Sequence, residues 1–273
     1  MSPARGAGRL SKAERDTLLA KMSRPLRVQP DEPVPSPQAA GEGWDVSFAT
    51  LPGTEMMQMQ RAAAGLLGLS DPFYRVHEMR AGVRSLIGGR PVLNFASYDY
   101  LGLNGHPAIV EAVTAATANW GTSVSASRLT AGERPFHRTL ERALADIYGA
   151  QDALVFVGGH GTNVSAIATI LGAEDLILYD ALSHNSIVIG AELSKATRRP
   201  FAHNDLDKLE ELLATHRPRH RRCLIVSEGL FSMDGDAPDL ARLVALKKRW
   251  GAWLMIDDAH ALGVLGETGL GRA

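Results

Sequence analysis

Two carboxylates and a histidine stand together near the C-terminal end of the sequence, at Asp257, Asp258 and His260. They directly follow residues 253–256, an apolar run that is typical of a buried strand. Open α/β sheets bind their ligands at the carboxyl ends of such strands. Because a buried carboxylate is costly without a positive partner, we expect a cationic group of a ligand beside this acidic pair.

The same side chains could instead hold a metal ion, with His203 and Asp205 as further ligands. No pair of histidines with zinc-site spacing accompanies them, so a metal is the weaker interpretation and we predict none. The single cysteine, Cys223, lies in an apolar run and is expected to be a buried strand residue, so it offers no thiolate site.

A second segment is rich in glycine: Gly158, Gly159, His160 and Gly161 follow the apolar run 153–157. Backbone N–H groups at a helix N-terminus bind phosphate when no side chains obstruct them. The spacing is neither GxGxxG nor a P-loop, which argues against a dinucleotide or a nucleoside triphosphate. A tight turn between strand and helix would use the same glycines, so a purely structural role stays open.

Two further strand ends carry polar side chains. His184 begins a predicted helix, where its ring could lie flat against a planar ligand or could simply cap the helix. Glu228 and Ser232 follow another apolar run, and Ser232 could donate a hydrogen bond to a ligand or form a turn. Four strand ends that deliver polar groups to one edge are together difficult to explain by structure alone.

Predicted helices and short apolar strands alternate from residue 107 onward. Helices are expected at 107–120, 135–148, 161–171, 184–193, 206–215 and 240–250. Strands are expected at 153–157, 176–179, 224–227 and 253–256. Near-continuous apolar strands separated by helices indicate an α/β fold, with a mostly parallel sheet flanked by helices on both faces.

The composition divides the chain into three regions. They are a flexible leader with a Pro-rich linker at 1–45, a helical segment and hairpin at 46–92, and a large α/β domain at 93–273. The leader contains a short helical pattern at 10–22, which could alternatively dock a partner module. In the second region we expect a helix at 55–69 and a hairpin around Gly88 and Gly89.

The overall charge is balanced, with 29 Lys and Arg against 30 Asp and Glu and a formal net charge of −1. This balance gives no indication of a nucleic-acid partner. No stretch approaches the roughly 18 apolar residues of a membrane span, and no secretory apolar segment follows the N-terminus. One cysteine fits a reducing compartment. We therefore expect a cytoplasmic protein that binds neither nucleic acid nor membrane.

Taken in order, these motifs resemble those of the α-oxoamine synthase family of fold-type I enzymes, which use pyridoxal 5'-phosphate (PLP). The resemblance covers about 72–273 and includes the segments 94–103, 121–132, 201–205, 228–235 and 257–263. It implies the fold of a PLP-dependent transferase, PLP as the cofactor, and a homodimer.

The resemblance also implies roles for individual residues. Asp257 faces the pyridine nitrogen of PLP and keeps it protonated, so that the ring can draw off carbanion charge. His184 stacks on the ring, and Ser232 and His260 lie around its phenolic oxygen. Asp257, His184 and His260 are accordingly the expected catalytic residues.

The glycine-rich turn resembles the cradle of the phosphate and the ring, which assigns Gly158, Gly159 and His160 to cofactor binding together with Glu228. The chain departs from the family here, because a Ser or Cys is usual near Gly158 and an aromatic residue is usual at His160. His160 could therefore add a ring contact or a hydrogen bond.

The implied activity joins an amino acid to an acyl thioester, carried by CoA or a carrier protein, with decarboxylation to an α-amino ketone. An aminotransferase or aldolase, or a non-catalytic partner subunit, stays open as an alternative. Family members place the Schiff-base lysine well beyond residue 260, and no lysine follows Lys248 here. We therefore expect the C-terminal part of the fold to be missing and this chain alone to be inactive.

Overall fold

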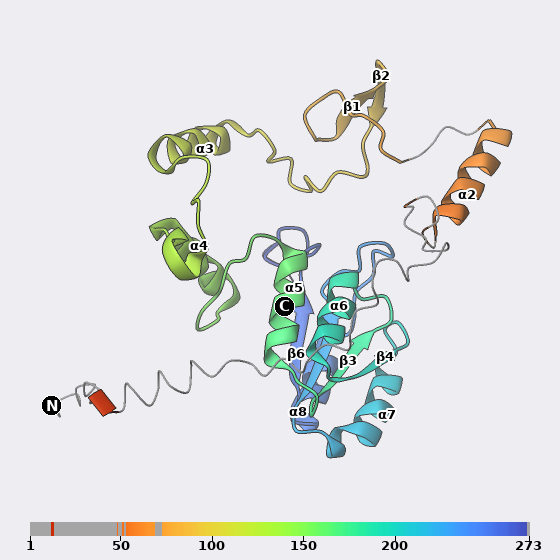
Figure 1. Ribbon diagram of the computed structural model, residues 1–273, viewed down its shortest axis with the longest axis vertical. Helices are drawn as coiled ribbons and strands as arrows, with labels where there is room; N and C mark the ends of the chain where they lie inside the picture. The colour runs from red at the N-terminus through yellow and green to blue at the C-terminus, as the bar shows by residue number, and fades with distance from the viewer. Residues whose placement is uncertain (1–11, 14–47, 49–50, 52, 69–72, 272–273) are drawn as a thin grey trace, which may run out of the picture. The chain divides into compact units, whose positions relative to one another are not determined.

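The computed structural model describes residues 12–13, 48, 51, 53–68 and 73–271 (Figure 1). The chain divides into two units, Met1–Arg75 and Val76–Ala273. Apart from residues 12–13, the predicted leader helix and Pro-rich linker lie outside the described residues. In the first unit, helix α2 (Thr54–Leu66) forms where the sequence predicts a helix.

Four parallel strands make the main sheet of the second unit. They are β3 (Leu176–Asp180), β4 (Thr197–Phe201), β5 (Cys223–Glu228) and β6 (Trp253–Asp257). Their order across the sheet is β4-β3-β5-β6. The chain leaves β3 toward β4 and then returns to the other side of β3 to form β5. This reversal of strand order creates a switch point between β3 and β5, where parallel sheets bind ligands.

Helices cover both faces of this sheet (Figure 1). One face packs against α5 (Gly159–Ile170) and α6 (Asn185–Ser194), and the other against α7 (Leu206–His216) and α8 (Leu240–Arg249). Along β3, Leu176 and Leu178 join the α7 and α8 side, whereas Ile177 and Tyr179 join the α5 and α6 side. Side chains alternate between the faces of a strand, so an apolar run without polar interruptions is buried on both sides. The predicted parallel sheet with helices on both faces is confirmed.

The segments before this sheet also follow the sequence pattern. Strands β1 (Arg84–Ile87) and β2 (Arg90–Leu93) form the predicted antiparallel hairpin. Gly88 and Gly89 have φ of 55° and 70°, a left-handed pair that glycine adopts without strain in a two-residue hairpin turn. Two helices with proline at the first position, α3 (Pro107–Trp120) and α4 (Pro135–Tyr148), coincide with their predicted ranges.

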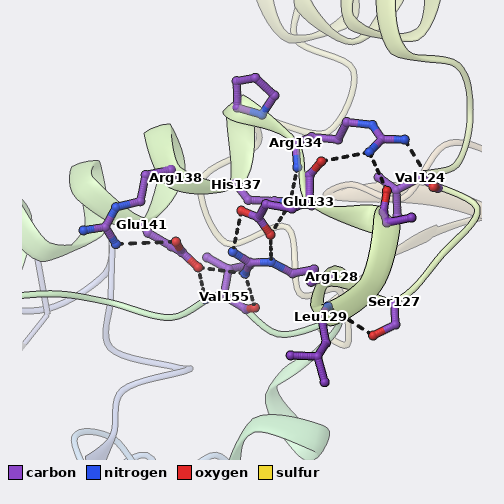
Figure 2. Close-up of polar contacts among 12 residues, drawn as sticks. Val124, Ser127, Arg128, Leu129, Glu133, Arg134, His137, Arg138, Glu141 and Val155 are labelled. Atoms are coloured by element: carbon purple, nitrogen blue, oxygen red, sulfur yellow. Dashed lines mark hydrogen bonds and ion pairs between the residues drawn. The ribbon is translucent and has the colours of Figure 1, made fainter. Parts of the chain in front are cut away.

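The strand predicted at 153–157 is wrong, because no strand forms there. Figure 2 shows the reason: the backbone groups of Val155 are bound by side chains. Its N–H donates to Glu141 Oε1 at 3.0 Å, and its carbonyl accepts from Arg128 Nη1 at 3.0 Å. These are the groups that a sheet ladder would use, so the apolar run reaches Gly158 as irregular chain.

Strand β4 is present although the sequence pattern did not predict it. Its residues Thr197, Arg198, Arg199, Pro200 and Phe201 include two charges and a proline. The strand lies at the edge of the sheet, where Arg199 and Pro200 are exposed. Edge strands tolerate charge and proline because one side of their backbone has no neighbour.

A short 3-10 turn, η4 (Arg217–Arg219), links α7 to β5, and a π-helical turn, η3 (Arg128–Gly132), precedes α4. Among the described residues, no helix is long and apolar enough to cross a membrane.

Candidate active site

A cavity of about 640 Å³ lies at the carboxyl ends of β5 and β6, beside the N-termini of α5 and α6. It is lined by seven of the predicted site residues: Gly159, His160, His184, Glu228, Ser232, Asp257 and His260. The structure therefore brings together residues that are up to 101 positions apart in the chain, from Gly159 to His260. Gly158 is not part of the lining and instead precedes the first residue of α5.

The sheet register places two carboxylates beside each other. Glu228 is the last residue of β5 and pairs with Asp257, the last residue of β6. The N–H of Gly229 donates to the main-chain carbonyl of Asp257 at 2.8 Å and extends the pairing by one residue. Both carboxylates therefore enter the cavity from neighbouring strand ends.

The N-terminus of α5 supplies unoccupied backbone donors. No side chain among the described residues caps it, and the first bond of the helix runs from Thr162 N–H to the Gly158 carbonyl at 3.0 Å. A Cβ atom built on Gly158, Gly159 or Gly161 would meet nothing within 4 Å. Free N–H groups at the positive end of a helix, with open space before them, are suited to a phosphate.

A chain of hydrogen bonds connects Asp257 to His184. Asn163 Nδ2 lies 2.7 Å from Asp257 Oδ2 and 3.0 Å from Ser186 Oγ. Ser186 Oγ lies 2.7 Å from His184 Nδ1. The other oxygen of Asp257, Oδ1, accepts the N–H of Ala259 at 3.1 Å. The aspartate and the histidine are therefore each held by specific donors.

Glu228 is almost completely buried, with 4% of its surface exposed. Burial, together with the nearby charges of Asp257 and Asp180, raises the pKa of Glu228 to about 7, although the N–H of His184 stabilises the charged form. That N–H donates to Glu228 Oε1 at 2.6 Å. Glu228 thus fixes the main chain of His184 through this hydrogen bond. The charge of Glu228 changes near neutral pH.

The rings of His160 and His184 meet edge to face, with centroids 6.1 Å apart and planes at 85°. His184 also begins α6, because its Nδ1 accepts the N–H of Ser186 at 3.3 Å. The capping role that the sequence left open is therefore present, and the ring still lines the cavity. His160 likewise lines the cavity, at the start of α5.

Two tyrosines that the sequence did not single out also contact the site. Tyr100 Oη lies 2.6 Å from His260 Nδ1. Tyr148, at the end of α4, donates to Asp258 Oδ2 at 3.4 Å, and burial raises the pKa of its phenol. Tyr100 belongs to the segment 94–103 and so was within reach of the sequence argument, whereas nothing local distinguishes Tyr148.

The residues of the alternative metal site are separated. His203 lies between Asp180 and Asp236, at 2.9 Å from a carboxylate oxygen of each. Asp205 caps α7 by accepting the N–H of Lys208 at 2.8 Å. Within the described part of the chain, no group of three or more His, Cys, Asp or Glu side chains could hold a metal ion.

None of the lysines that the structure describes lines the cavity. Lys195 follows α6 at the end opposite to His184 and has a left-handed backbone, with φ of 62°. Lys208 lies on α7, where it pairs with Glu211 at 2.6 Å.

Residues 90–272 match the family described as aminotransferase class I and II. A putative 8-amino-7-oxononanoate synthase of Gloeobacter violaceus is 47% identical over 197 residues, which cover 72% of this chain and 51% of that protein. Its counterpart in Thermosynechococcus vestitus is 47% identical over 182 residues, covering 67% and 46%. The chain thus spans about half the length of the curated relatives it matches.

Solved structures show the same likeness. A serine palmitoyltransferase from S. paucimobilis with a bound PLP–myriocin aldimine has a TM-score of 0.77 and 30% identity, over 82% of this chain and 56% of that one. An 8-amino-7-oxononanoate synthase from Francisella tularensis has a TM-score of 0.54 and 26% identity, over 65% and 48%. The predicted fold of a fold-type I PLP enzyme is confirmed. The predicted cofactor is confirmed for these relatives, one of which holds PLP.

The sheet, the cavity and the similar proteins all agree with the α-oxoamine synthase family, whose motifs this sequence resembles. This chain belongs to the aminotransferase class I and II family, and its similarity within that family is to the α-oxoamine synthases.

Proposed function

We propose that this chain forms the cofactor-binding part of a PLP-dependent α-oxoamine synthase. In the whole protein, an amino acid would be acylated at its α-carbon by an acyl thioester, with release of the free thiol and of CO₂, to give an α-amino ketone. The observation that carries the proposal is a cavity that joins an uncapped helix N-terminus, three carboxylates and three imidazoles. The predicted homodimer and cytoplasmic location belong to the same proposal.

The donor set of the cavity fits PLP. The free N–H groups at the start of α5 would bind its phosphate, and Asp257 would hold its pyridine nitrogen. When bound, PLP supplies an electron sink for the charge that develops on the amino acid. His184, at the start of the neighbouring helix, lines the same cavity and would be available to contact the ring.

The remaining residues of the site would bind oxygen atoms of the cofactor or substrate. Ser232 and His260 line the same cavity as Asp257 and can donate hydrogen bonds to oxygen atoms of the cofactor or substrate. Tyr100 orients His260 through its Nδ1, so that the Nε2 edge is the one available to a ligand.

Support for acyl transfer, as opposed to transamination or aldol cleavage, comes from the relatives. The curated relatives are named as putative 8-amino-7-oxononanoate synthases, and the similar solved structures include serine palmitoyltransferases. We infer the same substrate classes for the whole protein: an amino acid, and an acyl group carried as a thioester by CoA or a carrier protein.

Binding of PLP to this chain is the first test. Titration with PLP, followed by 31P NMR and absorbance, should show saturable binding by the wild type. Asp257→Ala should weaken it roughly 10–100-fold, which is the range expected for loss of a hydrogen bond to a charged group. Asp234→Asn is the matched control, because this exposed carboxylate lies outside the cavity lining. Equal affinity of wild type and Asp257→Ala would contradict the assigned site.

The reaction is tested in the full-length protein. Acyl-CoA should release free thiol and CO₂ in the presence of glycine, alanine or serine. Formation of a 2-oxo acid without thiol release would identify an aminotransferase instead. Absence of both products, with PLP bound, would favour the non-catalytic partner subunit.

A further inference from the structure

The hydrogen bonds of Asn163 and Ser186 can be assigned a direction. Both hydrogens of the Asn163 amide are used, one on Asp257 and one on Ser186, at 2.7 and 3.0 Å. The carboxylate can only accept, so the nitrogen of the amide must face it. Ser186 Oγ accepts from Asn163 and therefore has its own single hydrogen left to donate.

The hydroxyl hydrogen of Ser186 has one acceptor in this network, His184 Nδ1. Ser186 Oγ lies 2.7 Å from His184 Nδ1, and the Ser186 N–H points to the same nitrogen at 3.3 Å. A ring nitrogen that accepts from two donors carries no hydrogen, so the neutral ring must carry its hydrogen on Nε2. Asp257 cannot donate a hydrogen bond when it is ionised. It therefore sets the donor-to-acceptor direction of the hydrogen bonds from Asn163 through Ser186 to His184.

The network is buried and has rigid supports. Ser186 is fully buried and Asn163 is 7% exposed, so water competes little for these bonds. Asn163 comes from α5 and Ser186 from α6, and the two helices touch at Gly190. A Cβ atom at Gly190 would lie 3.0 Å from the Asn163 carbonyl oxygen and 3.0 Å from Ile167 Cβ. This close approach keeps the two side chains within hydrogen-bond distance.

We propose that Asn163 and Ser186 are positioning residues, which lock the Asp257 carboxylate and the His184 ring into one unit and fix the Nε2–H tautomer of His184. The proposal rests on the proposed function in one respect, that Asp257 and His184 are the groups that hold the cofactor. Neither Asn163 nor Ser186 needs to touch the reacting atoms. They act through the two residues that do.

The tautomer of His184 tests the proposal without any cofactor. In 15N-labelled protein at pH 8.5, the imidazole signals of His184, assigned by their loss in His184→Gln, should show Nε2 protonated and Nδ1 bare. In Ser186→Ala the two tautomers should mix, and Ser186→Thr should restore the wild-type pattern because it keeps the hydroxyl. A protonated Nδ1 in the wild type, or no change in Ser186→Ala, would overturn the proposal.

Cofactor affinity supplies a second readout. Asn163→Ala and Ser186→Ala should each weaken PLP binding roughly 5–20-fold. The loss of affinity in the double variant should be clearly smaller than the product of the two single losses, because each substitution disrupts the same network. Ser194→Ala is the matched control. This serine is also buried in α6, but it bonds the Ala191 carbonyl at 2.7 Å, far from His184 along the helix. Strictly multiplicative effects, or an equal loss in Ser194→Ala, would refute coupling.

The two readouts separate this proposal from the proposed function. If the wild type binds no PLP, the proposed function fails, while the tautomer experiment still decides whether the network sets His184. If PLP binds but the tautomer is insensitive to Ser186, the positioning role fails and the proposed function stands.

Discussion

Two buried glutamates of this protein have opposite surroundings. Glu141 on α4 is 2% exposed and Glu228 at the end of β5 is 4% exposed. Glu141 contacts Arg128 at 2.7 Å, and hydrogen bonds from Arg128 and the Val155 N–H lower its pKa to about 2 (Figure 2). In the part of the chain that the structure describes, no Lys or Arg forms an ion pair with Glu228, and burial raises the pKa of Glu228 to about 7.

The comparison shows that burial alone does not decide the behaviour of a carboxylate; its partners do. In the α4 region, Arg128 binds Glu133, Glu141 and the Val155 carbonyl together, so charge holds the irregular segment that leads to the glycine-rich turn. At the cavity, neutral donors hold the carboxylates instead. The first arrangement suits a structural clamp, and the second leaves charge available to a ligand.

The largest expected effect is on the clamp. Arg128→Met should leave the carboxylate of Glu141 without its main partner, and we expect the melting temperature to fall by roughly 5–10 °C. Scanning calorimetry at pH 7 measures the shift. Arg142→Met is the control, because Arg142 lies next to Glu141 on α4 and is exposed. Equal shifts for the two variants would mean that Arg128 is not a clamp.

The next effect concerns Glu228 and pH. The unfolded chain releases this proton near the ordinary value of 4.5 and the folded protein near 7, so the folded state binds more protons between these values. Stability therefore falls as pH rises through that window. Glu228→Gln removes the penalty, and we expect it to be more stable than the wild type at pH 8, on the order of 2 kcal/mol, and equal to it at pH 4.

Urea unfolding at several pH values measures the stability of Glu228→Gln relative to the wild type. Glu141→Gln is the comparison variant. The lowered pKa of Glu141 means that its contribution is present above pH 4.5 and is lost as pH falls toward 2. Glu141→Gln should therefore be less stable than the wild type at neutral pH and approach it in acid. Parallel pH profiles for the two variants would show that the two glutamates do not differ.

A smaller effect is expected from Gly190→Ala. The added methyl would lie 3.0 Å from the Asn163 carbonyl oxygen, so α5 and α6 must separate slightly. We expect the melting temperature to fall by roughly 2–5 °C and PLP binding to weaken by a few-fold. Gly172→Ala, where the nearest atom is at 4.0 Å, is the control. Unchanged PLP affinity in Gly190→Ala would show that the cavity does not depend on this helix contact.

Much of the fold follows from local sequence patterns. The apolar runs of β3, β5 and β6 and the periodic helices need only the preferences of nearby residues, so they were predicted within a few residues of their observed bounds. The prediction of a strand at 153–157 was wrong and β4 was not predicted, and both errors have the same cause. Whether an apolar segment pairs depends on distant partners, here Arg128 and Glu141, and a charged segment can pair at an edge.

The sequence by itself determined which chemical groups this protein has available: an uncapped glycine-rich turn, the acidic end of β6, and histidines at the starts of two helices. Only the tertiary structure decided that Asn163 would bond Asp257, 94 residues away, and that Glu228 would be buried near the carboxylates of Asp257 and Asp180. Local patterns report which face of an element is apolar. Hydrogen-bond direction and the cost of burying charge depend on groups brought close by the fold, which no local pattern encodes.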